Sequence, residues 1–216
     1  MQKYDRIIKL FGDENFQKFR NTKLIILGVG GVGGFALDSL YNTGITNITI
    51  VDFDTYEESN MNRQLGSHGN IDRIKVEVLK ERYPEVEIIN IKITPQWIDE
   101  FDFSSYDYIL DAIDDIKPKV HLINKYYSKV ISTSGGAKRI DPSKIEYISI
   151  WETYNDPFIR KIRYELKKLG FKKKFKVVFS SEEPKCLEKG SFEAVTGSFG
   201  FMLASVTIQK ILNKKT

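Results

Sequence analysis

The sequence is poor in the residues that build covalent or metal-based scaffolds. Its 216 residues include one cysteine, Cys186, and two histidines. A single cysteine excludes a disulfide framework or a four-cysteine zinc site within one chain, which favours a cytoplasmic protein. The histidines, His68 and His121, lie in no nucleophile motif. The sequence therefore indicates no Ser–His–Asp set for covalent catalysis.

Long hydrophobic runs are also missing. No stretch approaches the roughly 20 apolar residues that cross a bilayer, and residues 1–6 lack the apolar region of a signal peptide. The apolar helix expected over residues 197–212 is too short to span a membrane, so we expect it in the core or in a dimer contact. Hydrophobic residues still make up 41% of the chain, which is enough for a core.

Positive charge is abundant but unevenly distributed. The net charge is +4, yet residues 161–176 hold eight basic side chains against one acidic side chain, Glu165. The rest of the chain is therefore acidic on balance. A charged run of this kind can be a solvated helix face, but concentrating the whole surplus in one place favours a polyanionic partner.

Expected strands and helices alternate along the first two thirds of the chain. Apolar and β-branched runs predict the strands, and apolar residues at helical spacing predict the helices between them. The strands are expected over residues 23–28, 47–52, 86–93, 106–111 and 129–134, and the helices over residues 31–41, 71–83 and 118–129. This alternation predicts an α/β fold with a doubly wound, mostly parallel sheet of the Rossmann type.

The pattern loosens in the last third, where no repeat or low-complexity linker occurs. The expected elements are a strand over residues 145–151, a helix beginning at Asp156-Pro157, a strand over residues 175–180 and the helix over residues 197–212. We expect a single domain with a nucleotide-binding core over residues 1–136. A smaller C-terminal α/β extension, residues 137–216, is expected to face substrate or a dimer partner.

A glycine-rich turn follows the first expected strand. Residues 24–33 read LIILGVGGVG. A strand, a tight turn and a helix N-terminus in this order suit a nucleotide phosphate, because glycines let the backbone approach it and free helix amides attract an anion. The candidate phosphate-binding residues are Gly28, Gly30, Gly31 and Gly33. Alone, this turn leaves open whether the chemistry is redox or adenylation.

Charged residues farther along favour adenylation. Asp52 lies 24 residues after Gly28 and is followed by Asp54; an acidic residue at this point can bind the ribose of NAD or ATP. Arg63 and Lys75 can neutralise the β- and γ-phosphates of a triphosphate. An NAD dehydrogenase has no need for Arg63 and Lys75, because its cofactor carries no triphosphate.

Four further polar residues accompany Arg63 and Lys75. Asn60 can orient the region around Arg63, and Gln64 belongs to the same cluster. Asp111 and Asp114 follow the fourth expected strand, at the sheet edge where open α/β folds bind ligands. A carboxylate there can hold magnesium alongside phosphates. Asp111 can simply cap the next helix, so Asp114 is the candidate magnesium ligand.

Together these residues resemble the adenylating superfamily of ubiquitin-activating type, which includes the adenylyltransferases that activate molybdopterin synthase and thiamine sulfur carriers. The resemblance covers roughly residues 4–136. It implies binding of ATP and magnesium. The implied roles are ribose and magnesium for Asp52 and Asp54, triphosphate for Asn60, Arg63 and Lys75, and magnesium for Asp114.

The superfamily also implies a dimer. In it, an arginine near the N-terminus reaches into the ATP site of the partner subunit. Arg6, in the segment YDRIIKLFG, occupies that position. The resemblance therefore implies a homodimer as the active unit.

The second half of the chain resembles a narrower family, the tRNA threonylcarbamoyladenosine dehydratases. The segments that carry the resemblance are residues 133–145, 156–163, 177–184 and 197–200. The family implies ATP-dependent activation of the threonine carboxylate of a modified adenosine beside the tRNA anticodon, followed by ring closure. The implied partner is the anticodon arm of tRNA, for which residues 161–176 are the candidate docking segment. Sulfur-transfer accessory proteins are further partners consistent with the resemblance.

The chain departs from the family pattern at a few positions. The loop between Arg63 and Lys75 looks one residue short, and Asp72 stands where relatives often have glycine. Some relatives carry a cysteine near the position of Val177, whereas Cys186 lies elsewhere. This difference argues against a cysteine persulfide mechanism and favours a structural or surface role for Cys186.

Three other functions stay open at this point. Adenylation of a ubiquitin-like sulfur-carrier protein would use the same ATP site, but it usually needs a zinc clamp or a catalytic cysteine. An NAD-dependent oxidoreductase would leave Arg63, Lys75 and Asp114 unused. A non-catalytic nucleotide-binding scaffold would leave the triphosphate residues without a task. We therefore expect ATP-dependent dehydration of threonylcarbamoyladenosine in tRNA, with sulfur-carrier adenylation as the alternative.

Overall fold

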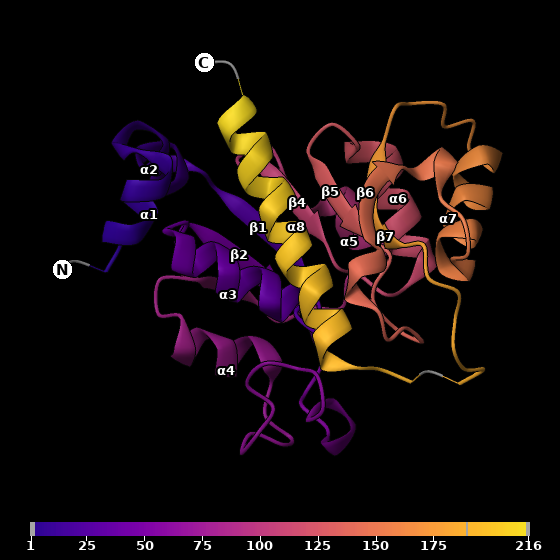
Figure 1. The fold of residues 1–216 in the computed structure, drawn as a ribbon, viewed down its shortest axis with the longest axis horizontal. Helices are drawn as coiled ribbons and strands as arrows, with labels where there is room; N and C mark the ends of the chain where they lie inside the picture. The colour runs from indigo at the N-terminus through magenta and orange to yellow at the C-terminus, as the bar shows by residue number, and fades with distance from the viewer. Residues whose placement is uncertain (1–2, 189, 215–216) are drawn as a thin grey trace.

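A seven-stranded sheet forms the centre of the molecule, with strand order β3-β2-β1-β4-β5-β7-β6. The computed structural model describes residues 3–188 and 190–214. Figure 1 shows helices on both faces of the sheet. The strands are β1 (Leu24–Leu27), β2 (Ile48–Val51), β3 (Glu87–Ile89), β4 (Tyr108–Asp111), β5 (Val130–Thr133), β6 (Ile145–Ser149) and β7 (Lys176–Ser180).

The helices mostly follow the expected pattern, with ends that shift by up to four residues. Three of them, α1, α2 and α5, were not expected. The α-helices are α1 (Asp5–Phe11), α2 (Asp13–Asn21), α3 (Gly33–Thr43), α4 (Lys75–Arg82), α5 (Pro95–Glu100), α6 (Ile116–Tyr126), α7 (Pro157–Lys168) and α8 (Glu193–Asn213). Short 3-10 turns are η1 (Glu58–Asn60), η2 (Pro142–Lys144) and η3 (Ile150–Glu152).

Strands β3, β2, β1, β4, β5 and β7 are parallel, and only β6 runs antiparallel, at the edge beside β7. The doubly wound, mostly parallel sheet is thus confirmed. Leu27 pairs in register with Val51 on one side and Asp111 on the other. The turns that follow β1, β2 and β4 therefore meet at one edge, here called the carboxyl edge; the opposite one is the amino edge.

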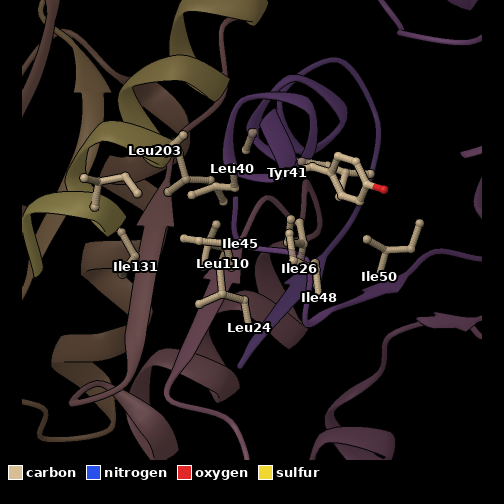
Figure 2. Packing of buried hydrophobic residues seen from close by; sticks show 14 of the residues in the cluster. Leu24, Ile26, Leu40, Tyr41, Ile45, Ile48, Ile50, Leu110, Ile131 and Leu203 are labelled. Carbon is tan, nitrogen blue, oxygen red and sulfur yellow. The ribbon is translucent and has the colours of Figure 1, made fainter. Parts of the chain in front are cut away.

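Apolar side chains fill both faces of the sheet. Side chains alternate along β1, so Leu24 and Ile26 point into the cluster under α3 and α8, while Ile25 and Leu27 point into the cluster under α5, α6 and α7. Figure 2 shows Leu24 and Ile26 beside Leu110 of the neighbouring strand. Burial on both faces explains why β1 is a continuous apolar run.

Helix α8 corrects one expectation. It has 21 residues and is, among the described helices, the one long and apolar enough by length and composition to cross a membrane. Our expectation that it is too short was therefore wrong. In this fold, 61% of its most apolar 18-residue window is buried, and Phe199, Leu203 and Ile211 lie in the same cluster as β1. Packing in the core, the expected role, accounts for its composition.

Candidate functional site

The glycine-rich turn closes tightly at the carboxyl edge, between β1 and α3. Gly28 has φ +87°, and a Cβ there would lie 2.9 Å from the carbonyl oxygen of Ala112, which follows β4. A Cβ on Gly33 would lie 1.9 Å from the carbonyl oxygen of Gly28. Only glycine fits these two positions. The turn therefore presents bare backbone at the sheet edge where α/β folds bind ligands.

Asp52 braces this turn from the end of β2. Its Oδ2 accepts a hydrogen bond from the Val29 amide at 2.8 Å, and its Oδ1 accepts one from the Asp54 amide at 3.0 Å. Burial raises the pKa of Asp52, and both backbone bonds and Lys75 oppose that rise. The Val29 amide is thus committed to the protein, so a phosphate must use other amides of the turn.

Three other amides of the glycine-rich turn are available to a phosphate. Among the described residues, none accepts a hydrogen bond from the amides of Gly30, Gly31 or Val32. They lie directly before the first residue of α3, where the helix dipole adds a partial positive charge. This is the arrangement that binds a nucleotide phosphate.

The structure brings Lys75 to the same edge despite the short loop. Lys75 begins α4; its amide donates to the Asp54 carbonyl at 3.0 Å and its Nζ lies 3.1 Å from Asp54 Oδ2. Asp72 adopts φ +66°, a left-handed conformation that favours glycine, and its amide donates to the Tyr56 carbonyl at 2.8 Å. Lys75 is buried, so its charge is little screened by water and acts more strongly than an exposed charge would.

Asn60 is the last residue of η1, and Arg63 lies three residues farther along the chain. Asn60 is buried, and its Oδ1 accepts from the Glu57 amide at 3.2 Å, which fixes the turn. The Arg63 guanidinium donates to the Ser59 carbonyl at 2.6 Å. The Arg63 carbonyl would lie 3.0 Å from a Cβ on Gly31. Arg63 therefore packs directly against the glycine-rich turn.

Gln64 supplies an independent sign of a ligand. Its Oε1 is buried and has no hydrogen-bond partner among the described residues. Its Nε2 lies 3.7 Å from the position of a Cβ on Gly30. A buried amide oxygen without a donor is costly, and a ribose hydroxyl or the adenine amino group of a bound nucleotide could donate to it.

Asp111 has a different role from the expected one. It does not cap α6; Asp115 does, accepting from the Lys117 amide at 3.1 Å. Instead, Asp111 Oδ2 pairs with Lys119 Nζ at 2.7 Å and accepts from Ser132 Oγ at 2.6 Å. Both charged side chains are fully buried, and burial lowers the pKa of Lys119 against the opposing charge of Asp111. This pair fastens α6 to β4 directly below the site.

Asp114 is exposed on the turn between β4 and α6, at the carboxyl edge. Within residues 3–188 and 190–214, no group of three or more His, Cys, Asp or Glu side chains is placed to hold a metal. A lone carboxylate still fits magnesium that is bound mainly by phosphates and water. The assignment of magnesium to Asp114 stays a prediction.

Other candidate residues lie away from this cluster. Arg6 is exposed on α1, and no hydrogen bond or ion pair of the described residues joins it to the glycine-rich turn. His121 Nε2 lies 2.9 Å from Asp99 Oδ1 on the side of α5. Cys186 is exposed, and its thiol donates to the Glu188 carbonyl. In the part of the chain that the structure describes, His121 thus contacts a neighbouring helix and Cys186 contacts its own loop.

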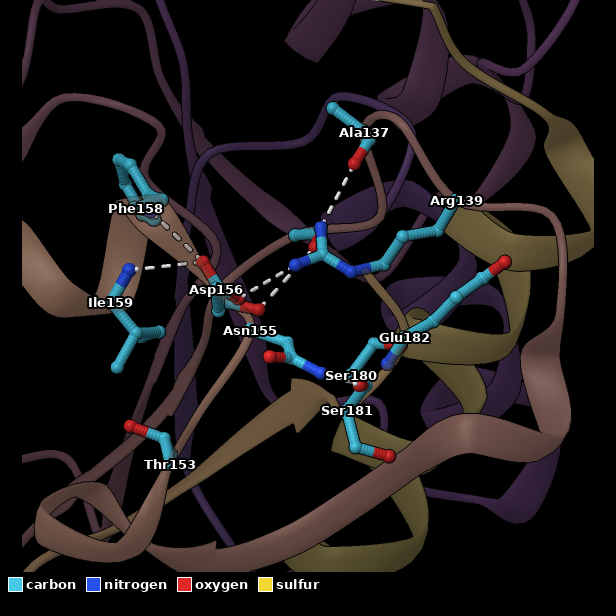
Figure 3. A network of polar contacts seen from close by, with 12 residues as sticks. Ala137, Arg139, Thr153, Asn155, Asp156, Phe158, Ile159, Ser180, Ser181 and Glu182 are labelled. Atoms are coloured by element: carbon cyan, nitrogen blue, oxygen red, sulfur yellow. Dashed lines mark hydrogen bonds and ion pairs between the residues drawn. The ribbon is translucent and has the colours of Figure 1, made fainter. Parts of the chain in front are cut away.

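One buried network at the carboxyl edge escaped the sequence analysis (Figure 3). Arg139, six residues after β5, donates from Nη1 to the Ala137 carbonyl at 2.9 Å, and its Nη2 lies 3.2 Å from Asp156 Oδ2. Asp156 Oδ1 caps α7 by accepting from the amides of Phe158 and Ile159. The pair therefore fastens the start of α7 to the edge that carries the glycine-rich turn.

Known proteins resemble this chain over most of its length. A model of the ThiF family matches residues 4–216. A tRNA threonylcarbamoyladenosine dehydratase of Bacillus subtilis is 34% identical, over 85% of this chain and 76% of that protein. Its counterpart in Haemophilus influenzae is 32% identical, over 100% of this chain and 95% of that protein.

Solved structures extend the similarity to the fold. The Escherichia coli tRNA N6-threonylcarbamoyladenosine dehydratase, crystallised in complex with ATP, superimposes with a TM-score of 0.93 at 32% identity, over 99% of this chain and 95% of that chain. The same enzyme in complex with AMP also gives a TM-score of 0.93. The resemblances identified from the sequence are thereby confirmed.

Proposed function

This chain belongs to the ThiF family, and we propose that it is a tRNA threonylcarbamoyladenosine dehydratase that uses ATP. The observation that carries the proposal is the carboxyl-edge site, where three unbonded amides before α3 meet Arg63, Lys75 and the unpartnered Gln64 Oε1. That site suits a triphosphate better than a dinucleotide. The match over nearly the whole chain to a dehydratase crystallised with ATP supports the substrate.

The reaction requires the protein to position the substrate and ATP and to neutralise the charge of the phosphates. A carboxylate oxygen of the substrate attacks the α-phosphorus of ATP, and the bond to the departing pyrophosphate breaks. A nitrogen of the same modified base then attacks the activated carbonyl carbon and loses a proton, and AMP leaves. The nucleoside has then lost one water, and no protein nucleophile is needed.

The residues of the site supply what these steps require. The amides of Gly30 and Gly31 can hold phosphate oxygens at the helix N-terminus. Arg63 and Lys75 can neutralise the charge that develops on pyrophosphate, which is the largest catalytic contribution in such reactions. Asp114 would hold magnesium, which screens the phosphate charges when bound.

The direct test uses the protein with ATP, magnesium and tRNA that carries threonylcarbamoyladenosine. We expect the nucleoside to lose the mass of one water, with one AMP released for each turnover. AMP release that requires a ubiquitin-like sulfur-carrier protein would favour the alternative. NAD binding tighter than ATP binding would contradict both the proposed dehydration and the sulfur-carrier alternative.

We also propose that the active unit is a homodimer. An apolar hollow of about 330 Å³ lies between α1, α3 and α8, and it is lined in part by Phe11, Phe201 and Leu212. Leu10 and Phe201 are 73% and 49% exposed. Exposed apolar side chains beside such a hollow favour an interaction site. Arg6 lies on α1 with Leu10, which places it beside the proposed interface.

Subunit mixing tests whether Arg6 acts on the partner. Arg6→Ala and Arg63→Ala should each be inactive, whereas an equal mixture after subunit exchange should recover about a quarter of wild-type activity, because each mixed dimer contains one intact site. Dehydration is the readout, and light scattering verifies that dimers form. Absence of recovery in a mixture of proven dimers would place Arg6 outside the partner's site.

A further inference from the structure

A second hollow lies at the amino edge of the sheet, away from the glycine-rich turn. It has a volume of about 450 Å³ and is lined among others by Tyr127, Tyr147, Glu152, Lys174, Lys176 and Lys210. Lys176 is the first residue of β7, which runs parallel to β1 and the other central strands. The hollow and the ATP site are therefore at opposite ends of the strands.

The lining carries an excess of positive charge. Lys174 and Lys176 come from the segment before and into β7, and Lys210 comes from the far end of α8. No ion pair within the described part of the chain joins any of the three to a carboxylate, and Glu152 is the single acidic side chain of the lining. Burial, with the charge of Lys176, lowers the pKa of Lys210. A bound anion would relieve this repulsion.

The segment that carries these lysines is anchored. Phe171 and Phe175 are buried, and Trp151 Nε1 donates to the Lys173 carbonyl at 3.1 Å. The Lys173 ammonium lies 5.9 Å from the centre of the Tyr127 ring. Aromatic contacts therefore hold this part of the backbone in place, and little ordering is needed on binding.

Helix α7 connects the two ends of the molecule. Its cap, Asp156, is paired with Arg139 at the carboxyl edge, and the chain that follows it packs through Phe171 onto Tyr127, just before β5. Its 12 residues span about 18 Å. Figure 1 shows α7 on the outside of the molecule. The exposed side chains of this helix include Arg160, Lys161, Tyr164 and Lys167.

Resting on the proposed function, we propose that the hollow at Lys174, Lys176 and Lys210 binds a backbone phosphate of the tRNA substrate. The exposed basic side chains of α7 lead from there to the carboxyl edge, where the modified base is adenylated. Lysines and tyrosine hydroxyls are common donors to nucleic-acid phosphates, and such contacts fix position without reading sequence. The hollow thus extends the basic segment 161–176 with a lysine from a distant helix.

The test compares two double variants that lose the same charge. Lys174→Ala with Lys210→Ala removes two lysines of the hollow. The control, Lys18→Ala with Lys125→Ala, removes two lysines that pair with Glu14 and Asp99 on other surfaces. Binding of tRNA carrying threonylcarbamoyladenosine is measured as a function of salt, together with the dehydration kinetics.

We expect the hollow variant to bind tRNA about tenfold more weakly near 0.15 M salt, with a salt slope about 0.7 to 0.9 less steep, since that is the contribution of one phosphate contact. The KM for tRNA should rise, while kcat and the KM for ATP stay unchanged because the ATP site is remote. The control should keep wild-type affinity and slope.

Unchanged tRNA affinity and salt slope in a folded hollow variant would overturn the inference. The inference would also be overturned if the hollow variant lost binding of inorganic pyrophosphate but kept its tRNA affinity. That result would show that the hollow binds a free anion rather than tRNA. If the wild type binds tRNA but never dehydrates it, and the hollow variant alone loses tRNA binding, the proposed function fails and the phosphate site stands.

Discussion

Lys119→Met is expected to lower the free energy of unfolding by about 3–5 kcal/mol, because it leaves the Asp111 carboxylate buried without its counter-ion. The two groups lie 2.7 Å apart and neither is exposed to solvent. For a chain of this size each kcal/mol corresponds to about 2–4 °C, so the melting temperature should fall by about 10 °C. Urea unfolding near neutral pH measures the free energy.

Two variants serve as controls for this prediction. Lys125 pairs with Asp99 at the same distance, 2.7 Å, but on the surface, so Lys125→Met should cost less than about 1 kcal/mol. Lys119→Met combined with Asp111→Asn should recover much of the loss, since no charge is then left buried. Equal losses for Lys119→Met and Lys125→Met would show that burial does not decide the contribution of the pair.

Arg63→Ala is expected to reduce ATP–pyrophosphate exchange by at least about 100-fold, the size of effect seen when one stabilising donor is removed from a transition state. Stability should change little, because the Arg63 guanidinium donates only to nearby groups, the Ser59 carbonyl and Asn62 Oδ1. Exchange is followed with labelled pyrophosphate, and the melting temperature is measured beside it.

Arg73 provides the matched control for Arg63. It lies in the same loop region, but its guanidinium pairs with Glu81 on the surface. Arg73→Ala should therefore keep nearly full exchange. Exchange retained by Arg63→Ala would remove Arg63 from the reaction, and exchange lost in both variants would point to damage of the loop rather than to a missing charge.

The sheet could be predicted because its order follows from local patterns. Alternating strands and helices imply parallel strands, and each expected strand lies where the structure has one. The helices that escaped prediction are short. Gly12, at φ +80°, separates α1 from α2, and α5 has only six residues, so the helical periodicity is visible over too few positions. Thr94-Pro95 does give a start signal for α5, since Thr94 caps it.

The position of the candidate site at one edge of the sheet could be predicted for a related reason, whereas the roles of its residues stay predictions. Parallel strands end at one edge, so residues after β1, β2 and β4 had to converge. Lys119 and Arg139 could not be found in this way, because a charged residue in a helix or loop is normally exposed. Their burial depends on partners, Asp111 and Asp156, that only the folded chain brings to them.

The bond between the Val29 amide and Asp52 has a consequence for how nucleotide is captured. Folding itself sets the shape of the glycine-rich turn, so its conformational entropy is already lost before a ligand arrives. A triphosphate then meets a preorganised receptor, and its contact energy appears as affinity rather than being consumed in ordering a loop. Asp52 would in that way strengthen the hold on phosphates that its own carboxylate never touches.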